Sequence, residues 1–146
     1  MTIEERVERY KELFPDCKAF SPMRKVIIAK GYRSANIHQR IELLRELDTE
    51  LAGAYKVTIP VITFFVRDNN YVKETKEIYL TEPDLEGFLH QFRHHLQNEA
   101  REYERRLLLV EDNKSIDYRL PYKDAKSLFE GEDDAVAWSR FIIESV

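Results

Sequence analysis

Residues 57–66 read VTIPVITFFV, and this stretch decides the fold class that we predict for the chain. Most of its residues are β-branched or aromatic, which favours a strand over a helix. In residues 61–66 the apolar side chains fall on both faces, so the strand should be covered in part on both sides. Pro60 cannot donate a hydrogen bond to a β-ladder, and it indicates a strand start, a bulge or an edge strand.

A turn and a second strand follow this stretch. Residues 67–70 read RDNN and predict a turn, because asparagine tolerates positive φ better than most residues. Residues 71–80 are predicted to return as a second, more polar strand, so that the two strands form a β-hairpin. A third short strand at residues 116–120 is left open, and residues 107–110 could be either helix or strand.

Two helices are predicted near the start of the chain. Thr2 followed by Glu5 is a capping box that begins the first helix, and Pro15 ends it. The Ser-Pro pair at residues 21–22 begins the second helix, because serine caps a helix and proline suits its first turn. Gly31 ends this helix as a left-handed cap.

A third helix leads up to the strands. Asn36 begins it, with Gln39 placed to complete a capping box, and Gly53 ends it. Its apolar stripe comprises Ile37, Ile41, Leu44, Leu47 and Leu51.

The longest helix is predicted after the hairpin. It opens at residues 81–84, TEPD, where proline and acids suit a first helical turn. Its apolar stripe comprises Leu85, Phe88, Leu89, Phe92, Leu96, Tyr103 and Leu107. A small domain does not easily cover that much apolar length, so we expect a homo-oligomer that packs through this helix.

Two short helices complete the chain, one at residues 122–130 and one after Gly131. The last should bury Trp138, Phe141 and Ile142. We therefore predict an α+β fold: three N-terminal helices, a β-hairpin with a third short strand left open, one long amphipathic helix and a short helical C-terminal tail.

The composition indicates a single folded domain over residues 1–146. Hydrophobic residues make up 43% of the chain, and glycine and proline are few, which argues against disorder. Cys17 is the only cysteine, so neither an intramolecular disulfide nor a multi-cysteine metal site is expected. The N-terminus lacks the layout of a signal peptide, and no apolar run approaches the ~20 residues that cross a bilayer. We expect a soluble, cytoplasmic protein without membrane partners.

The charge of the chain is segregated along the sequence. Residues 17–41 hold six lysines and arginines and no acid, whereas the net charge of the whole chain is −4. The remainder therefore carries −10. Charges that serve only to keep a protein soluble do not need to be segregated in this way.

The basic segment loosely resembles a helix-turn-helix unit, with glycine in the turn and apolar anchors on both sides. The residues that carry this resemblance are Val26, Ile27, Gly31, Ile37 and Ile41. The resemblance implies that polar residues near the start of the third helix face a major groove. These residues are Ser34, Asn36, His38, Gln39 and Arg40.

From this segment we predict a small non-catalytic binding or regulatory protein that contacts nucleic acid or another polyanion. The candidate binding residues are Arg24, Lys25, Lys30, Arg33, His38, Gln39 and Arg40. Other interpretations stay open. The cations could pair with surrounding acids across the surface, or they could contact an acidic protein partner. The protein could also be an interaction or inhibitor module that acts through its acidic surface or its long helix, without nucleic acid.

The sequence contains no positive signal for an enzyme. It has no glycine-rich phosphate loop and no serine in a nucleophile elbow, and no acid/base pair of carboxylates can be nominated. We therefore name no catalytic residues and expect no cofactor.

One constellation on the long helix could bind a metal ion. Glu86, His90 and His94 stand four residues apart, which places their side chains on the same helix face. The apolar stripe places His90 and His94 on the opposite, wet face, so we predict two exposed histidines and no metal site. The acidic run at residues 130–134 lacks the spacing of a calcium loop, and we expect it to place carboxylates at the positive end of the last helix.

Overall fold

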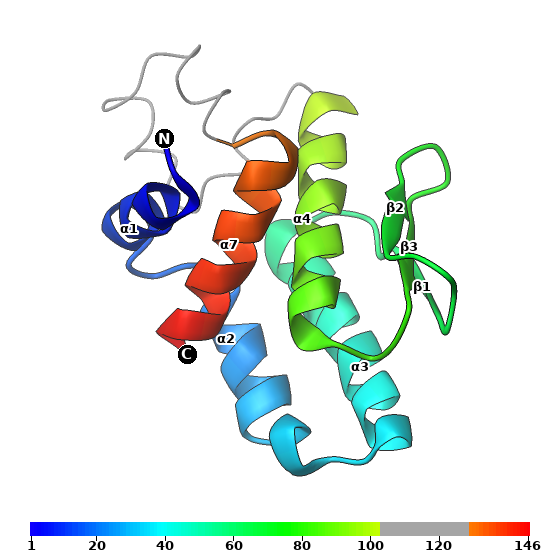
Figure 1. The fold of residues 1–146 in the computed structure, drawn as a ribbon. Helices are drawn as coiled ribbons and strands as arrows, with labels where there is room; N and C mark the ends of the chain where they lie inside the picture. The colour runs from blue at the N-terminus through cyan, green and yellow to red at the C-terminus, as the bar shows by residue number, and fades with distance from the viewer. Residues whose placement is uncertain (103–128) are drawn as a thin grey trace.

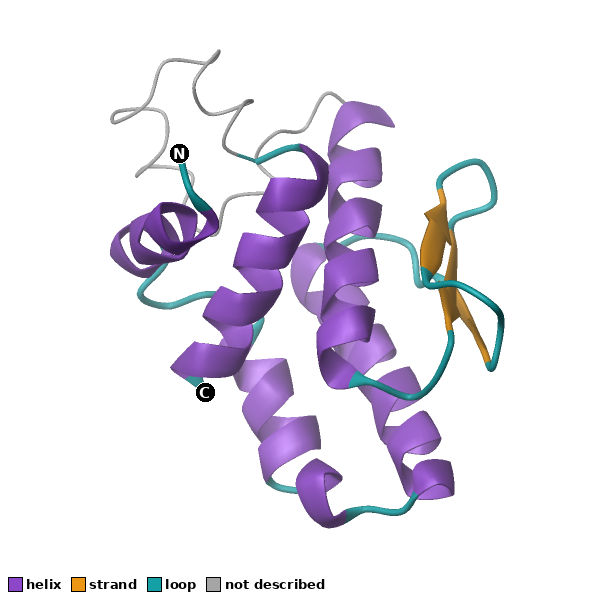
Figure 2. Ribbon diagram, viewed as in Figure 1, coloured by secondary structure: helices purple, strands orange, loops and turns teal. Residues whose placement is uncertain are grey.

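The computed structural model of the chain describes residues 1–102 and 129–146. The secondary structure elements are α1 (Ile3–Leu13), α2 (Phe20–Pro22), η1 (Met23–Ile28), η2 (Tyr32–Ser34), α3 (Ile37–Tyr55), β1 (Val61–Phe64), β2 (Asn70–Val72), β3 (Glu77–Leu80), α4 (Leu85–Glu102) and α7 (Gly131–Ser145). The predicted α+β fold is confirmed: helices make up most of the structure, and a small three-stranded sheet lies at one side of them, against α4 (Figures 1 and 2).

Several predictions fall on residues 103–128, outside the described part of the chain. They concern Tyr103 and Leu107 of the apolar stripe, the state of residues 107–110, the strand at 116–120 and most of the helix at 122–130. In the described ranges, no helix combines the length and apolar character that crossing a bilayer requires.

The predicted starts of α1 and α3 are confirmed at atomic detail. At α1 the Thr2 hydroxyl accepts the Glu5 N–H, and at α3 the Asn36 side chain accepts the Gln39 N–H. In both boxes the longer side chain reaches back to the backbone N–H of the cap. These caps satisfy N–H groups that a helix start otherwise leaves without partners.

The helix that precedes α3 has two forms. It begins as α2 at Phe20 and continues as η1 in the wider π-helical form. The predicted cap at Ser21 is wrong, because Ala19 is the N-cap and Ser21 lies inside the first turn. The left-handed conformation predicted for Gly31 is confirmed by its φ of 69°, which disfavours a Cβ, but the helix itself ends at Ile28 with Ala29 as its C-cap. Helix α3 continues two residues beyond the predicted end at Gly53, and Lys56 ends it with a φ of 55°.

The strand pairing differs from the predicted hairpin. The strand order is β1-β3-β2, in which β1 pairs with β3 in parallel and β2 pairs with β3 antiparallel. The hairpin therefore lies within residues 70–80, because a turn that includes Lys76, with a φ of 56°, divides the predicted second strand. Strand β1 starts directly after Pro60, which agrees with the strand start that was one of the three structures predicted from this proline.

Strand β1 is an edge strand, and it is not covered on both sides as predicted. Ile62 is buried, whereas Val61 and Phe65 are each 61% exposed. The sheet has helix α4 packed against it and is too small to enclose a strand at its edge.

The core lies where α7 packs against α1 and α4, which brings both ends of the chain together (Figure 1). Aromatic rings from three parts of the chain meet there, including Tyr10, Phe14, Phe129 and Phe141. The predicted burial of Trp138, Phe141 and Ile142 is confirmed.

The predicted apolar stripes of α4 and α3 are buried to different extents. In α4, Phe88, Leu89, Phe92 and Leu96 are fully buried within the chain itself. The homo-oligomer through this helix stays a prediction. In α3 the stripe is buried from Leu44 onwards, but Ile37 is 48% exposed because it is the first residue of the helix.

Candidate metal centre between α4 and α7

Three potential metal ligands converge where the middle of α4 meets the first turn of α7. His90 and His94 come from α4 and Glu132 from α7, and their ligand atoms all lie within 4.8 Å of one another. His90 Nε2 lies 2.9 Å from Glu132 Oε2, and His94 Nε2 lies 2.7 Å from Glu132 Oε1. Each imidazole thus faces one oxygen of the same carboxylate.

Local helix geometry positions each of these side chains. The two histidines stand four residues apart, so their rings lie one above the other, with centroids 5.0 Å apart. Glu132 lies in the acidic first turn of α7, as the run at residues 130–134 predicted, because carboxylates are favoured at the positive end of a helix. The packing of α7 on α4 then brings the carboxylate to the histidines.

The sequence-based interpretation of these histidines was wrong in two respects. Their side chains are only 19% and 18% exposed, so they are not on a wet face, because α7 partly covers that side of α4. The third group is Glu132 and not Glu86: both are exposed, but only Glu132 lies within reach of the two histidines. Glu132 stands 42 residues after His90, and no local spacing could have identified it.

The pKa values of His90 and Glu132 are both shifted at this centre. Burial lowers the pKa of His90, and His94 lowers it further, which favours the neutral imidazole. Burial alone would raise the pKa of Glu132, but His94 and His90 together bring it below its usual value. Neutral imidazole and ionised carboxylate are the forms that coordinate divalent metals.

A hydrogen-bond network behind the centre fixes the orientation of His94. Gln97 donates through its Nε2 to Asp134 Oδ2 at 2.7 Å and to the Gly131 carbonyl at 3.1 Å. Its Oε1 lies 2.9 Å from His94 Nδ1, so this oxygen accepts the Nδ1–H proton. The other ring nitrogen, Nε2, faces Glu132.

His94 Nε2 and Glu132 Oε1 lie at the distance of an ion pair. The two atoms are 2.7 Å apart, and Nε2 is buried without a well-aligned hydrogen bond among the described residues. A protonated His94 would pair with this carboxylate directly, whereas a metal ion would bind each ligand along its own lone pair.

The candidate polyanion residues lie on the continuous segment from η1 to the start of α3, at the bottom of Figure 1. Six of the seven are exposed, and Arg40 is half-buried. The exposed residues are Arg24, Lys25, Lys30, Arg33, His38 and Gln39.

Several of these side chains have partners within the chain. Lys25 pairs with Glu50 at 2.9 Å, and Lys30 pairs with Glu46. Gln39 belongs to the capping box of α3.

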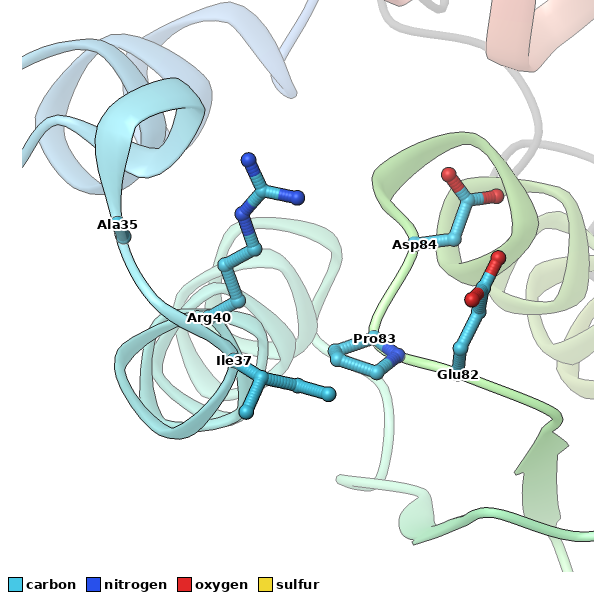
Figure 3. Close-up of a pocket in the computed structure, with 6 residues that line it drawn as sticks. All are labelled: Ala35, Ile37, Arg40, Glu82, Pro83 and Asp84. Carbon is cyan, nitrogen blue, oxygen red and sulfur yellow. The ribbon is translucent and has the colours of Figure 1, made fainter.

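The Arg40 side chain is held in place by neighbouring residues. It donates to the carbonyls of Tyr32 and Arg33, and its guanidinium lies 5.1 Å from the centre of the Tyr32 ring. It lines a shallow pocket together with Glu82 and Asp84 (Figure 3). Acids therefore stand beside this cation.

The chain matches no protein-family model, no curated protein and no solved structure.

Proposed function

We propose that the protein binds one divalent transition-metal ion of the zinc class through His90, His94 and Glu132. The observation that carries this proposal is the convergence of three potential ligand atoms, from His90, His94 and Glu132, within 4.8 Å of one another. The fixed His94 ring supports the proposal, because metal-binding histidines characteristically hold their other ring nitrogen in a hydrogen bond.

The ligand set selects the class of metal. Two imidazole nitrogens and one carboxylate suit Zn²⁺ and its neighbours, whereas Ca²⁺ and Mg²⁺ prefer ligands that are all oxygen. Cu²⁺ and Ni²⁺ bind such ligands as well, and Cu²⁺ generally does so more tightly, so they are the competitors to compare.

The test is titration of the metal-free protein with Co²⁺, whose tetrahedral complexes absorb visible light, followed by displacement with Zn²⁺. We expect one ion per chain. His90→Ala, His94→Ala and Glu132→Gln should each weaken binding at least about tenfold, which corresponds to about 1.4 kcal/mol.

Two matched controls separate this centre from weaker binding by surface groups. His38→Ala removes an exposed histidine on α3, and Glu86→Gln removes the carboxylate that local spacing on α4 had indicated. Both variants should bind like the wild type. A protein that binds no metal would refute the proposal, and so would a Glu132→Gln variant with unchanged affinity.

Contact with nucleic acid or another polyanion is a second candidate function. Its specific support is the exposure of Arg24, Lys25 and Arg33 on one acid-free segment that also carries His38. Retention of DNA or RNA should fall steeply with salt, because bound cations release counterions from the phosphates. Reversal of Arg24, Lys25 and Arg33 to glutamate should abolish retention, whereas Arg67→Glu should not. Absence of retention at low salt would refute this candidate.

The remaining proposals concern partners and location. A pull-down that returns one stoichiometric protein and no nucleic acid would support the interaction module, and a measured mass in solution would test the homo-oligomer. A cytoplasmic location, where Cys17 stays reduced, belongs to each of these proposals.

A further inference from the structure

A cavity of about 280 Å³ adjoins the candidate metal centre. His94 and Glu132 form part of its wall, and the rest comes from Gln91 of α4 and from residues 69–71 and 73 around β2. A metal ion held by three protein ligands keeps a fourth position for water or a bound molecule. The cavity lies where such a molecule would reach the metal.

Gln91 contributes a polar group to the wall of this cavity. The residue is only 7% exposed, and its amide makes no hydrogen bond within the part of the chain that the structure describes. The amide is not sealed inside the protein, so it can contact a molecule bound in the cavity.

Two further groups on the opposite wall are donors. Asn69 Oδ1 accepts the Thr81 N–H at 2.7 Å, which leaves its Nδ2 as the group available to the cavity. A Cβ at Gly87 would come within 3.1 Å of this Nδ2, so the glycine allows the amide to lie against α4. Lys73 adds a positive charge, and it forms no ion pair among the described residues.

The backbone that carries Lys73 is itself fixed. Asn98 of α4 donates to the Lys73 carbonyl at 3.2 Å and to the Tyr71 hydroxyl at 3.0 Å. Tyr71 in turn donates to Nδ1 of buried His95, whose Nε2 donates to the Thr58 carbonyl. The cavity wall is therefore tied to α4 by an exposed hydrogen bond at Lys73 and by part-buried ones at Tyr71 and His95.

We infer that a small molecule bearing a phosphate or carboxylate group binds in this cavity, with one oxygen on the metal and the others facing Gln91, Asn69 and Lys73. This inference rests on the proposed function, because the metal supplies one of the contacts. Amide donors, an ammonium group and a divalent cation all favour a negatively charged oxygen.

The test uses the full chain loaded with Co²⁺, titrated separately with inorganic phosphate and with acetate while the visible spectrum is recorded. We expect at least one of the two anions to change the spectrum saturably, and comparison of the two separates phosphate from carboxylate chemistry. Lys73→Ala and Gln91→Leu should each weaken the binding of that anion at least about fivefold while the affinity for Co²⁺ stays within twofold of the wild type.

Arg67→Ala is the matched control, because it removes an exposed cation from the same loop without touching the cavity. It should leave the affinity for the anion unchanged. If Co²⁺ binds but neither anion alters its spectrum, or if Lys73→Ala and Gln91→Leu bind both anions like the wild type, the inference is overturned and the metal centre stands. If Co²⁺ does not bind at all, the proposed function fails first and the inference fails with it.

Discussion

Asp48 is a buried carboxyl group in the middle of α3. It is only 4% exposed, and its Oδ1 has no hydrogen-bond partner in the described residues. Burial raises the pKa of Asp48 from 3.8 to about 8, although Arg45 acts in the opposite direction. The folded protein therefore keeps this carboxyl protonated at a pH at which the unfolded chain ionises it.

The sign of the resulting pH dependence follows from this raised pKa. The contribution of Asp48 to stability is fully present below pH 3.8, and it is lost progressively as the pH rises toward about 8. The full loss is about 6 kcal/mol at most, because each pKa unit corresponds to about 1.4 kcal/mol.

Asp48→Asn should remove this loss, because an amide of the same shape cannot ionise. We expect the variant to be more stable than the wild type at pH 8, by an amount up to that limit, and similar to it at pH 4. Urea unfolding of both proteins across this range measures the difference. Asp68→Asn, at an exposed position, should show no such trend. A difference between Asp48→Asn and the wild type that did not grow with pH would contradict the assignment.

At the scale of single elements, the sequence predicted what depends on neighbouring residues. Both capping boxes and the left-handed Gly31 are local devices, and all three are confirmed. The pairing of β1 with β3 was missed because it joins segments separated by a turn, a strand and a second turn. Strand propensity indicates that a strand forms but not which neighbour it takes.

Three buried polar residues could have been predicted from the helical pattern of the sequence but were not. Asp48 lies one turn after Leu44, Arg93 lies one turn after Leu89, and Asp134 lies one turn before Trp138. Each polar residue is therefore in phase with the apolar stripe of its own helix, and each is buried. Helical phase alone could have identified these three positions, since side chains four residues apart share a face.

The metal centre shows the limit of the same reasoning. His90 and His94 were identified from their spacing, but Glu132 joins them only because α7 packs on α4. The cavity beside them depends on residues 69–73 as well. Tertiary packing brings these segments together, and a single sequence does not show which distant segments will meet in the fold.

At the scale of the whole molecule, one buried ion pair connects three helices that are distant in the sequence. Arg93 Nε of α4 donates to Asp134 Oδ2 of α7 at 2.8 Å, and the Tyr10 hydroxyl of α1 donates to Asp134 Oδ1. Both charged side chains are fully buried. The guanidinium also lies 5.3 Å from the centre of the Trp138 ring, which adds a cation–π contact.

The pKa values of Arg93 and Tyr10 both depend on the Asp134 carboxylate. Burial alone would lower the pKa of Arg93, but the carboxylate of Asp134 raises it above its usual value. Burial and Asp134 also raise the pKa of Tyr10, so its hydroxyl keeps the proton that it donates. Asp134 further accepts from Gln97, which holds His94 in place, so the ion pair supports the metal centre as well as the core.

Arg93→Met should therefore destabilise the whole molecule, because it leaves the Asp134 charge buried without its cation. We expect a loss of about 3–5 kcal/mol in the free energy of unfolding, measured with urea at pH 7. The double variant Arg93→Met with Asp134→Leu should recover much of this loss, since it removes both charges together. Arg140→Met, which removes an exposed cation from α7, should change stability by less than about 1 kcal/mol. Equal losses in the single and double variants would show that Arg93 acts through its packing against Trp138 rather than through its charge.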